Sequence, residues 1–290
     1  MMRFAPVQHD PATIARYGDL FAACFPGVNK FTPAYLDWLY LANPDGQAVG
    51  YDAWDGERLA AHYVCIPARA WVEGREVTVL LSLNTATHPD YQGKGLFTKL
   101  AAMTFEAGAA AGHDGVYGVA NANSTPGFVR KLGFQLVRPL EARIGLGRLR
   151  HGARPAPQSL SFERSWSEAA LAWRCANPHN PVARRDGAAR RAFHAPALTG
   201  IPAYAELGPA PRQGTDGGAT GGGLSPLRLS PLRLFIGLAP DSTANYWNYA
   251  SIPLKLRPSP LNLIYRSFTD RVAALDPARI QFSFLDFDAY

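Results

Sequence analysis

The sequence predicts an α/β protein built on a mixed β-sheet. Three strand-like segments follow one another through short turns, the third runs into a glycine turn that opens a helix, and strands and helices alternate after it. A chain of 290 residues with 47% hydrophobic and 18% charged residues is long enough and apolar enough to bury a sizeable core.

Each element of the first half is expected from a local signal. Thr32 is an N-cap, Pro33 takes the first helical position, and the turn Asn43-Pro44-Asp45-Gly46 ends that helix. Short turns at 55–57 and 73–75 are typical of hairpins. The expected strands are 1–7, 47–54, 58–69, 75–88, 115–121 and one that begins at 133; the expected helices are 10–24, 32–40, 96–112 and one that begins near 124.

The second half carries weaker signals. A helix is expected at 165–177 and strands at 232–238, 260–268 and 279–287, with a Gly/Pro-rich insertion at 207–231. The segment WLYLANP at 38–44 has an echo in WRCANP at 173–178. Together these features predict two related domains, residues 1–147 and 148–290.

Charge and cysteine content narrow the class of protein. The net charge is +6, and its excess lies in residues 146–290, which hold 17 Lys and Arg against 10 Asp and Glu. The one dense basic cluster, 184–191, has no aromatic residues within it, so a nucleic-acid partner is not expected. Three cysteines without CxxC spacing, no signal peptide and no long apolar run predict a cytoplasmic protein without a membrane span. The oligomeric state is left open.

The stretch YQGKGLF at 91–97 is the main candidate for a binding site. Glycines between a strand and a helix leave several backbone N–H groups pointing at one place, and the helix N-terminus and Lys94 add positive charge. This arrangement suits a phosphate or pyrophosphate. It is not a Walker loop, because Gly95 follows Lys94, nor a G-x-G-x-x-G fingerprint, because residue 98 is Thr.

Two segments carry a family resemblance. THPDYQGKGLFTKLAAMTFEAGAAAG and VANANSTPGFVRKLGF resemble the GNAT family of acyl-CoA-dependent N-acetyltransferases, and the resemblance covers about residues 3–147. It implies a GNAT fold and acetyl-CoA as cosubstrate, with no metal. The second half carries no Gln-x-x-Gly-x-Gly and reads SPLRLSPLRL where the loop is expected, which predicts a degenerate GNAT-like domain that binds no coenzyme.

The resemblance also places the coenzyme. A backbone N–H within residues 83–87 would face the thioester carbonyl, the amides of residues 93–97 would hold the pyrophosphate, and Gln92 would shape the turn. Asn123 and Phe128 would flank the thiol arm. The expected coenzyme-binding residues are therefore Thr85, Ala86, Thr87, Gln92, Gly93, Lys94, Gly95, Leu96, Phe97, Asn123 and Phe128.

The catalytic acid and base stay open at this stage. Val129 stands where many members of the family carry a Tyr that protonates the leaving thiolate, and Tyr117 is an alternative acid. Strand periodicity puts Ser82 and Asn84 on one face, with no carboxylate beside them. The candidate bases are His62, whose alternative role is simple packing, and a water held by Asn84.

These observations predict transfer of an acetyl group from acetyl-CoA to a small-molecule primary amine. The missing carboxylate favours an amine of low basicity, and the two segments also resemble a bacterial GNAT branch that accompanies polysaccharide assembly. An amino sugar or nucleotide-linked amino sugar is the expected acceptor. The alternatives are a peptide or protein amine, or a non-catalytic acyl-CoA-binding module. The tail FSFLDFDAY is expected to form an edge strand, with Asp286 and Asp288 solvated rather than at the acceptor.

Overall fold

A computed structural model describes residues 1–149, 156–188, 190–198, 200–209, 231–242, 246–257 and 259–288. Residues 210–230, which make up most of the expected insertion, lie outside the described residues. The last residues of SPLRLSPLRL are described and begin a strand.

The first half has the predicted order of strands and helices. Asp10 accepts hydrogen bonds from the backbone of Ala12 and Thr13, and Thr32 accepts one from Tyr35, so both predicted helix starts are capped. The elements are β1 (Met2–Pro6), α1 (Pro11–Cys24), α2 (Pro33–Tyr40), β2 (Val49–Asp55), β3 (Arg58–Val72), β4 (Arg75–Thr87), α3 (Leu96–Ala110), β5 (Gly115–Ala120), α4 (Thr125–Leu132) and β6 (Gln135–Pro139).

The second half contains more strands than the sequence signals indicate. Its expected helix and the strands near 232–238 and 260–268 are present, whereas 279–287 is a short strand followed by a 3-10 turn. The elements are β7 (Glu141–Leu146), β8 (Phe162–Arg164), α5 (Glu168–Cys175), β9 (Ala183–Asp186), β10 (Arg191–Leu198), β11 (Ile201–Leu207), β12 (Leu232–Leu238), β13 (Tyr249–Ser251), β14 (Asn262–Ser267) and β15 (Ile280–Ser283).

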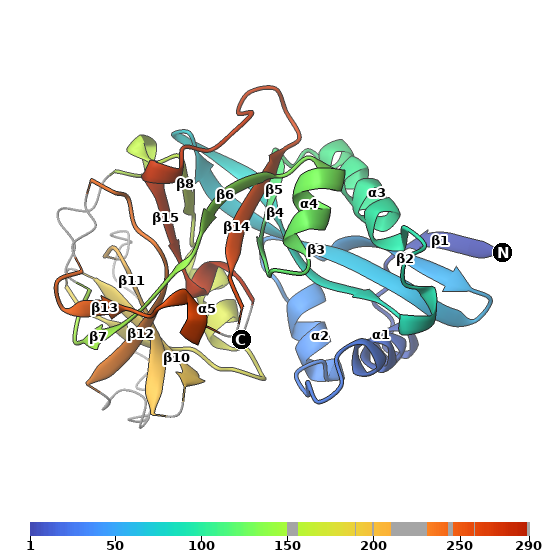
Figure 1. Cartoon of the computed structure of the whole chain (residues 1–290), viewed down its shortest axis with the longest axis horizontal. Coiled ribbons are helices and arrows are strands. Elements are labelled where there is room, and N and C mark those ends of the chain that lie inside the picture. Colours follow the sequence, from blue (N-terminus) through green and yellow to red (C-terminus); the bar gives the residue numbers. More distant parts are fainter. Residues whose placement is uncertain are drawn as a thin grey trace.

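The two halves exchange strands. In the first half the pairing order is β1-β2-β3-β4-β5-β14-β6, so β14 lies between β5 and β6 (Figure 1). In the second half the order is β9-β10-β11-β12-β7-β13, and β7 lies between β12 and β13. In each half, the strand beside the exchanged strand pairs in parallel with its other neighbour. These parallel pairs are β4 with β5 in the first half and β11 with β12 in the second. The second half therefore repeats the pairing pattern of the first.

The sequence echo corresponds to a symmetric contact between α2 and α5. Trp38 and Trp173 stack with ring centroids 4.8 Å apart, and the indole N–H of each donates to the backbone carbonyl of the other at 2.8 Å. In the two turns that follow, the Asn43 side chain accepts from the N–H of Asp45, and Asn177 accepts from that of His179. A division into related halves at residue 147 remains our proposal, and the exchange means that neither range holds all strands of its sheet.

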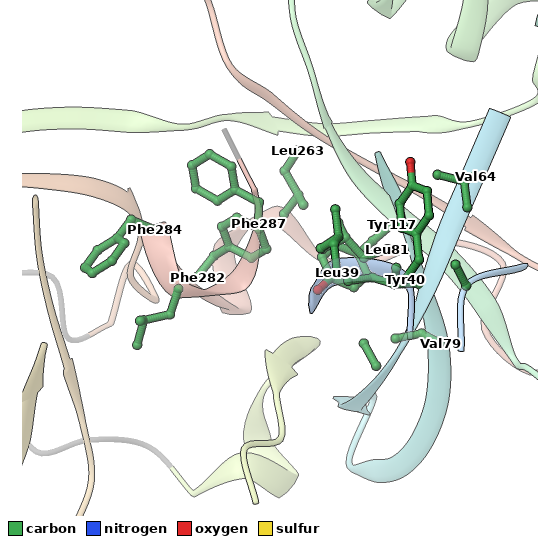
Figure 2. Close-up of a cluster of buried hydrophobic side chains, with 14 of the residues drawn as sticks. Leu39, Tyr40, Val64, Val79, Leu81, Tyr117, Leu263, Phe282, Phe284 and Phe287 are labelled. Atoms are coloured by element: carbon green, nitrogen blue, oxygen red, sulfur yellow. The ribbon is translucent and has the colours of Figure 1, made fainter. Parts of the chain in front are cut away.

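Two apolar clusters cover the faces of the first sheet. One lies against α1 and α2 and continues into the second half. Figure 2 shows side chains of the C-terminal tail, including Phe282 and Phe287, in the same cluster as Tyr40 of α2 and Tyr117 of β5. The other cluster lies between the sheet and helices α3 and α4. Burial of this apolar surface by both halves supplies the main force that holds them together.

The C-terminal tail differs from its prediction. β15 pairs with both β8 and β12, so it is an interior strand rather than an edge. The side chain of Asp286 is buried and accepts from the backbone N–H of Ser283 and the indole N–H of Trp166. The side chain of Asp288 is 5% exposed and contacts the Tyr35 hydroxyl and the Lys30 ammonium. The expectation of solvated carboxylates was wrong, because donors distant in the sequence, on Trp166, Tyr35 and Lys30, meet them in the fold. Among the described residues, none of the helices has the length and apolar character needed to span a membrane.

Candidate functional site

The parallel strands β4 and β5 separate at one end. Their pairing runs from Val79 opposite Gly115 to Ser82 opposite Gly118 and goes no further. β4 continues to Thr87 and β5 to Ala120, so the last part of each strand borders a gap in the ladder. We call the region between residues 83–87 and 119–120 the β4–β5 opening.

A bulge in β4 lies at this opening. His62 pairs with Ala86 but Val64 pairs with Leu83, which leaves one extra residue in β4 and gives neither Asn84 nor Thr85 a partner on β3. Asn84 has φ of +47°, in the left-handed region that non-glycine residues seldom adopt. A bulge leaves a backbone group outside the ladder, so a donor is available here beside the opening.

The bulge overturns the prediction that Ser82 and Asn84 share a face. The Ser82 hydroxyl lies 2.7 Å from that of Tyr63, on the side of the sheet that α3 covers. The Asn84 side chain instead donates to the Tyr40 hydroxyl of α2, at 3.1 Å on the opposite side. The extra residue shifts the period of two by one position, and a one-residue shift moves a side chain to the other face.

The glycine turn has the geometry that its sequence predicts. Gly93 and Gly95 have φ of +75° and +74°, and α3 begins directly after them without a side-chain cap. The first hydrogen bond of the helix is that from Lys99 to Gly95. In the part of the chain that the structure describes, the N–H groups of residues 93–98 have no protein acceptor, as the first turn of a helix requires. They are available to an anion.

Side chains around the turn fix its position. The Gln92 amide donates to the carbonyl of Thr87 at 3.3 Å and so ties the turn to the end of β4. The Lys94 ammonium lies 4.7 Å from the centre of the Tyr91 ring; Lys94 is exposed, whereas Tyr91 is buried in the apolar cluster under α3. Leu96 is buried in the apolar cluster under α3, so only its backbone faces outward.

The residues expected along the thiol arm divide into two kinds. Phe128 of α4 is buried and packs edge-on against Phe97 of α3, with ring centroids 5.1 Å apart, so it holds the starts of the two helices together. Asn123 is exposed before α4, and its backbone N–H donates to the Asn121 side chain. Of the β4 residues, Ala86 is buried, whereas Thr85 and Thr87 are partly exposed.

A buried hydrogen-bond network runs inward from Asn84. The hydroxyl of Tyr40, which accepts from Asn84, lies 3.0 Å from Nε2 of His62. The other ring nitrogen of His62, Nδ1, lies 2.7 Å from Oδ1 of Asp52. The other oxygen of Asp52 accepts from the Tyr17 hydroxyl at 2.8 Å. The bonds give one consistent direction, in which Asn84 donates to Tyr40, Tyr40 to His62, and His62 to Asp52. Burial is the main cause that raises the pKa of the Tyr40 hydroxyl, which therefore stays protonated.

This network changes the interpretation of His62. The imidazole is completely buried and both ring nitrogens have protein partners, so it does not reach a substrate directly. Any effect of His62 on a substrate passes through Tyr40 and Asn84. The sequence interpretation missed Tyr40, Asp52 and Tyr17; the signal for Asp52 was the hairpin register, which places it directly opposite His62.

Tyr117 is not positioned as an acid for the opening. Its hydroxyl donates to the carbonyl of Asp286 at 2.9 Å and accepts from the Arg164 guanidinium at 3.2 Å. The ring is fully buried, and this burial raises the pKa of Tyr117 to about 12. Val129 is half-buried on α4. Within the described ranges, no three His, Cys, Asp or Glu side chains gather as metal ligands would, and the absence of a metal stays a prediction.

The β4–β5 opening, the bulge beside it and the glycine turn that begins α3 all lie within one segment for which a family comparison finds a match. Residues 10–137 match the family model described as an acetyltransferase (GNAT) domain. No curated protein matches the chain.

Solved structures share the fold over nearly the whole chain at low identity. A GCN5-related N-acetyltransferase from Kribbella flavida is 12% identical, with a TM-score of 0.59 over 92% of this chain and 72% of that one. One from Anabaena variabilis ATCC 29413 is 12% identical, with a TM-score of 0.57 over 91% and 72%. A conserved protein of unknown function from Enterococcus faecalis V583, described as a probable N-acyltransferase, is 11% identical, with a TM-score of 0.56 over 92% and 73%. The similarity therefore extends to both halves.

Proposed function

We propose that the protein is an acyl-CoA-dependent N-acyltransferase that moves an acetyl group from acetyl-CoA to a primary amine. The observation that carries this proposal is the row of backbone N–H groups at residues 93–98, which lies next to the opening between β4 and β5. Donors at a helix N-terminus suit the pyrophosphate of coenzyme A, and a gap between strands gives its thiol arm a route through the sheet.

In this proposal each predicted residue has a position along the coenzyme. The amides of Gly93, Lys94, Gly95, Leu96 and Phe97 hold the pyrophosphate, and Gln92 keeps the turn in place. Thr85, Ala86 and Thr87 line the β4 side of the thiol arm, with Asn123 and the Phe128 region of α4 on the other. No metal takes part.

The bulge then serves the chemistry. The amine nitrogen attacks the thioester carbonyl, and a backbone N–H at Asn84 or Thr85 stabilises the oxyanion that forms. The C–S bond breaks, and coenzyme A leaves as a thiolate that solvent protonates. The proton that the nitrogen loses passes to a water held by Oδ1 of Asn84, for which the described residues provide no protein donor. His62 acts only by positioning, through Tyr40.

The proposed acceptor is an amine of low basicity, because the bulge has no carboxylate beside it, within the described ranges, to act as a base. Among the residues that the structure describes, no carboxylate is hydrogen-bonded to Asn84 or Tyr40, and the acid in the network, Asp52, is buried behind His62. Deprotonating an alkyl amine with a pKa near 10 costs about 4 kcal/mol at neutral pH. A less basic amine needs much less, and we therefore propose an amino sugar or a nucleotide-linked amino sugar as acceptor, with a peptide amine as the alternative.

One observation favours the second candidate function, a non-catalytic acyl-CoA-binding module. Val129 supplies no acid, and the two candidate groups with proton chemistry, His62 and Tyr117, are both fully buried. A module that binds acyl-CoA without turnover would need no such group. Release of free thiol from acetyl-CoA, followed with a panel of amines that includes nucleotide-linked amino sugars, separates the two functions; activity with none of them supports the binding module.

The coenzyme site is tested by Gly95→Val with Gly112→Val as its matched control. Gly95 has φ of +74° and Gly112 φ of +87°, and at both positions an added Cβ meets no atom within 4 Å. The left-handed conformation costs a non-glycine residue roughly 1–2 kcal/mol at either position. Only the first change disturbs the row of N–H groups, so we expect coenzyme A binding to weaken at least tenfold in Gly95→Val alone.

Calorimetric titration measures this comparison and also the stoichiometry, which we expect to be one coenzyme per chain. Thermal unfolding shows whether the two variants lose similar stability. Equal affinities for coenzyme A in Gly95→Val, Gly112→Val and wild type would place the site elsewhere, and two bound molecules would contradict a second half without a coenzyme site.

A further inference from the structure

A second site is suggested by an apolar cavity of about 350 Å³ in the second half. Its walls come from the exchanged strand β7, from β10 and β12, and from the segment that leads into β14. The aliphatic lining residues are Leu140, Ala142, Ala197, Leu198, Leu234, Ile236, Ile252, Leu256 and Leu261, and two polar residues, Arg257 and Ser259, complete it. Cavities of this size with few polar groups are typical of small-molecule sites.

The rim of the cavity exposes large apolar side chains. Leu256 is 67% exposed and Leu198 49%, and both line the cavity; Leu254, two residues before Leu256, is 68% exposed. Each leucine left in water forgoes about 1.5–3 kcal/mol of burial. Exposed apolar residues that gather around a hollow, rather than singly, are typical of binding surfaces.

Arg257 gives the cavity a positive end. Its Nε donates to the carbonyl of Ile252 at 3.0 Å and its Nη1 to that of Leu140 at 3.0 Å, which fixes the guanidinium at the lining. In the part of the chain that the structure describes, no carboxylate forms an ion pair with it. Two backbone carbonyls leave its charge uncompensated, and its Nη2 is available to a ligand anion. Lys255 adds a second positive charge on the same short turn.

We infer that this cavity binds the aliphatic chain of a single anionic amphiphile and that Arg257 binds the anionic group. The apolar walls account for the chain, and the fixed guanidinium accounts for the charge. Ser259 connects the cavity to the first half, because its hydroxyl accepts from the N–H of Ala122, in the segment between β5 and α4. The inference stands on the cavity alone and does not depend on acyl transfer.

The test uses the full chain and four ten-carbon probes below their micelle concentrations: decanoate, decyl phosphate, decanol and decyltrimethylammonium. We expect the two anions to bind with one molecule per chain, decanol to bind more weakly, and the cation not to bind. A preference between decanoate and decyl phosphate identifies the anionic group. Ala197 is half-buried on the wall, so Ala197→Phe fills the cavity and should abolish binding of the two anions and of decanol.

Three further variants test the role of Arg257. Arg257→Gln should weaken anion binding at least tenfold and leave decanol unchanged. Arg257→Lys keeps the charge but loses the fork toward the two carbonyls, so it should weaken anion binding, though less than Arg257→Gln does. Arg185→Gln removes an exposed charge on β9 and should change nothing.

Several outcomes overturn the inference. The first is anion affinity that is the same in Arg257→Gln and wild type, and the second is anion affinity that is as low in Arg257→Lys as in Arg257→Gln. The third is adsorption of the protein to anionic vesicles without binding of the monomeric probes, and the fourth is no binding of any probe. Gly95→Val should bind the amphiphiles with wild-type affinity. The two sites are therefore tested independently, because failure of the proposed coenzyme site does not contradict amphiphile binding and failure of amphiphile binding does not contradict the coenzyme site. Thermal unfolding of each Arg257 variant and of Ala197→Phe reports whether the chain is folded.

Discussion

Tyr40→Phe tests whether the buried network that ends at Asn84 serves the reaction or only the fold. The change removes one hydroxyl and almost no volume. It breaks the bond from Asn84 at 3.1 Å and the bond to Nε2 of His62 at 3.0 Å. His62 is fully buried, so its Nε2 has no water to replace the lost partner.

The expected loss of stability follows from that unpartnered nitrogen. Leaving a buried polar atom unsatisfied costs about 1–3 kcal/mol, so the free energy of unfolding should fall by that amount. Asn84, whose backbone has φ of +47°, also loses the hydrogen bond that holds its side chain. If this bond positions the bulge for the thioester carbonyl, kcat should fall roughly ten- to a hundredfold. Complete removal of one oxyanion donor costs about 2.7–4 kcal/mol, and a misplaced donor costs less than that.

Tyr63→Phe is the matched control. Tyr63 is also fully buried in the same strand region, and its hydroxyl lies 2.7 Å from that of Ser82, but on the α3 side of the sheet. Both variants should lose similar stability in urea unfolding, and both should bind coenzyme A with wild-type affinity. Thiol-release kinetics then separate them, because only Tyr40→Phe should lose kcat. A kcat for Tyr40→Phe equal to that of Tyr63→Phe would refute a role for the network in the reaction.

Two further predictions concern the leaving group and acid stability. Val129→Tyr should fold and turn over at least as fast as wild type in the thiol-release assay, since it adds an acid where solvent now protonates the thiolate; a large rate loss with normal coenzyme affinity would show that Val129 shapes the acceptor site instead. Burial lowers the pKa of His9 and of His113 from 6.5. The unfolded chain therefore binds protons first as the pH falls, and the melting temperature should drop between roughly pH 7 and 5.5. The double variant His9→Gln/His113→Gln should show a flatter profile; a profile as steep as that of wild type would assign the acid sensitivity to other groups.

The sequence alone determined the elements whose signals are local. The cap at Thr32, the hairpin turns and the glycine turn at 93–95 all depend on residues within four positions of one another. The row of free N–H groups at the start of α3 follows from the helix itself, because the first turn of any helix leaves these donors without partners. For this reason the candidate phosphate site was predicted, whereas most of the surrounding side-chain chemistry was not.

Only the tertiary structure decided which side chains meet. The bulge that turns Asn84 toward Tyr40 depends on the register between β3 and β4, and the Asp52–His62 pair depends on the register between β2 and β3. The exchange of β7 and β14 depends on pairing between strands far apart in the chain. The carboxylates of the tail meet donors on the distant residues Trp166, Tyr35 and Lys30. Local propensity does not encode these contacts, because register and strand partners are selected by the total apolar surface that both halves bury together.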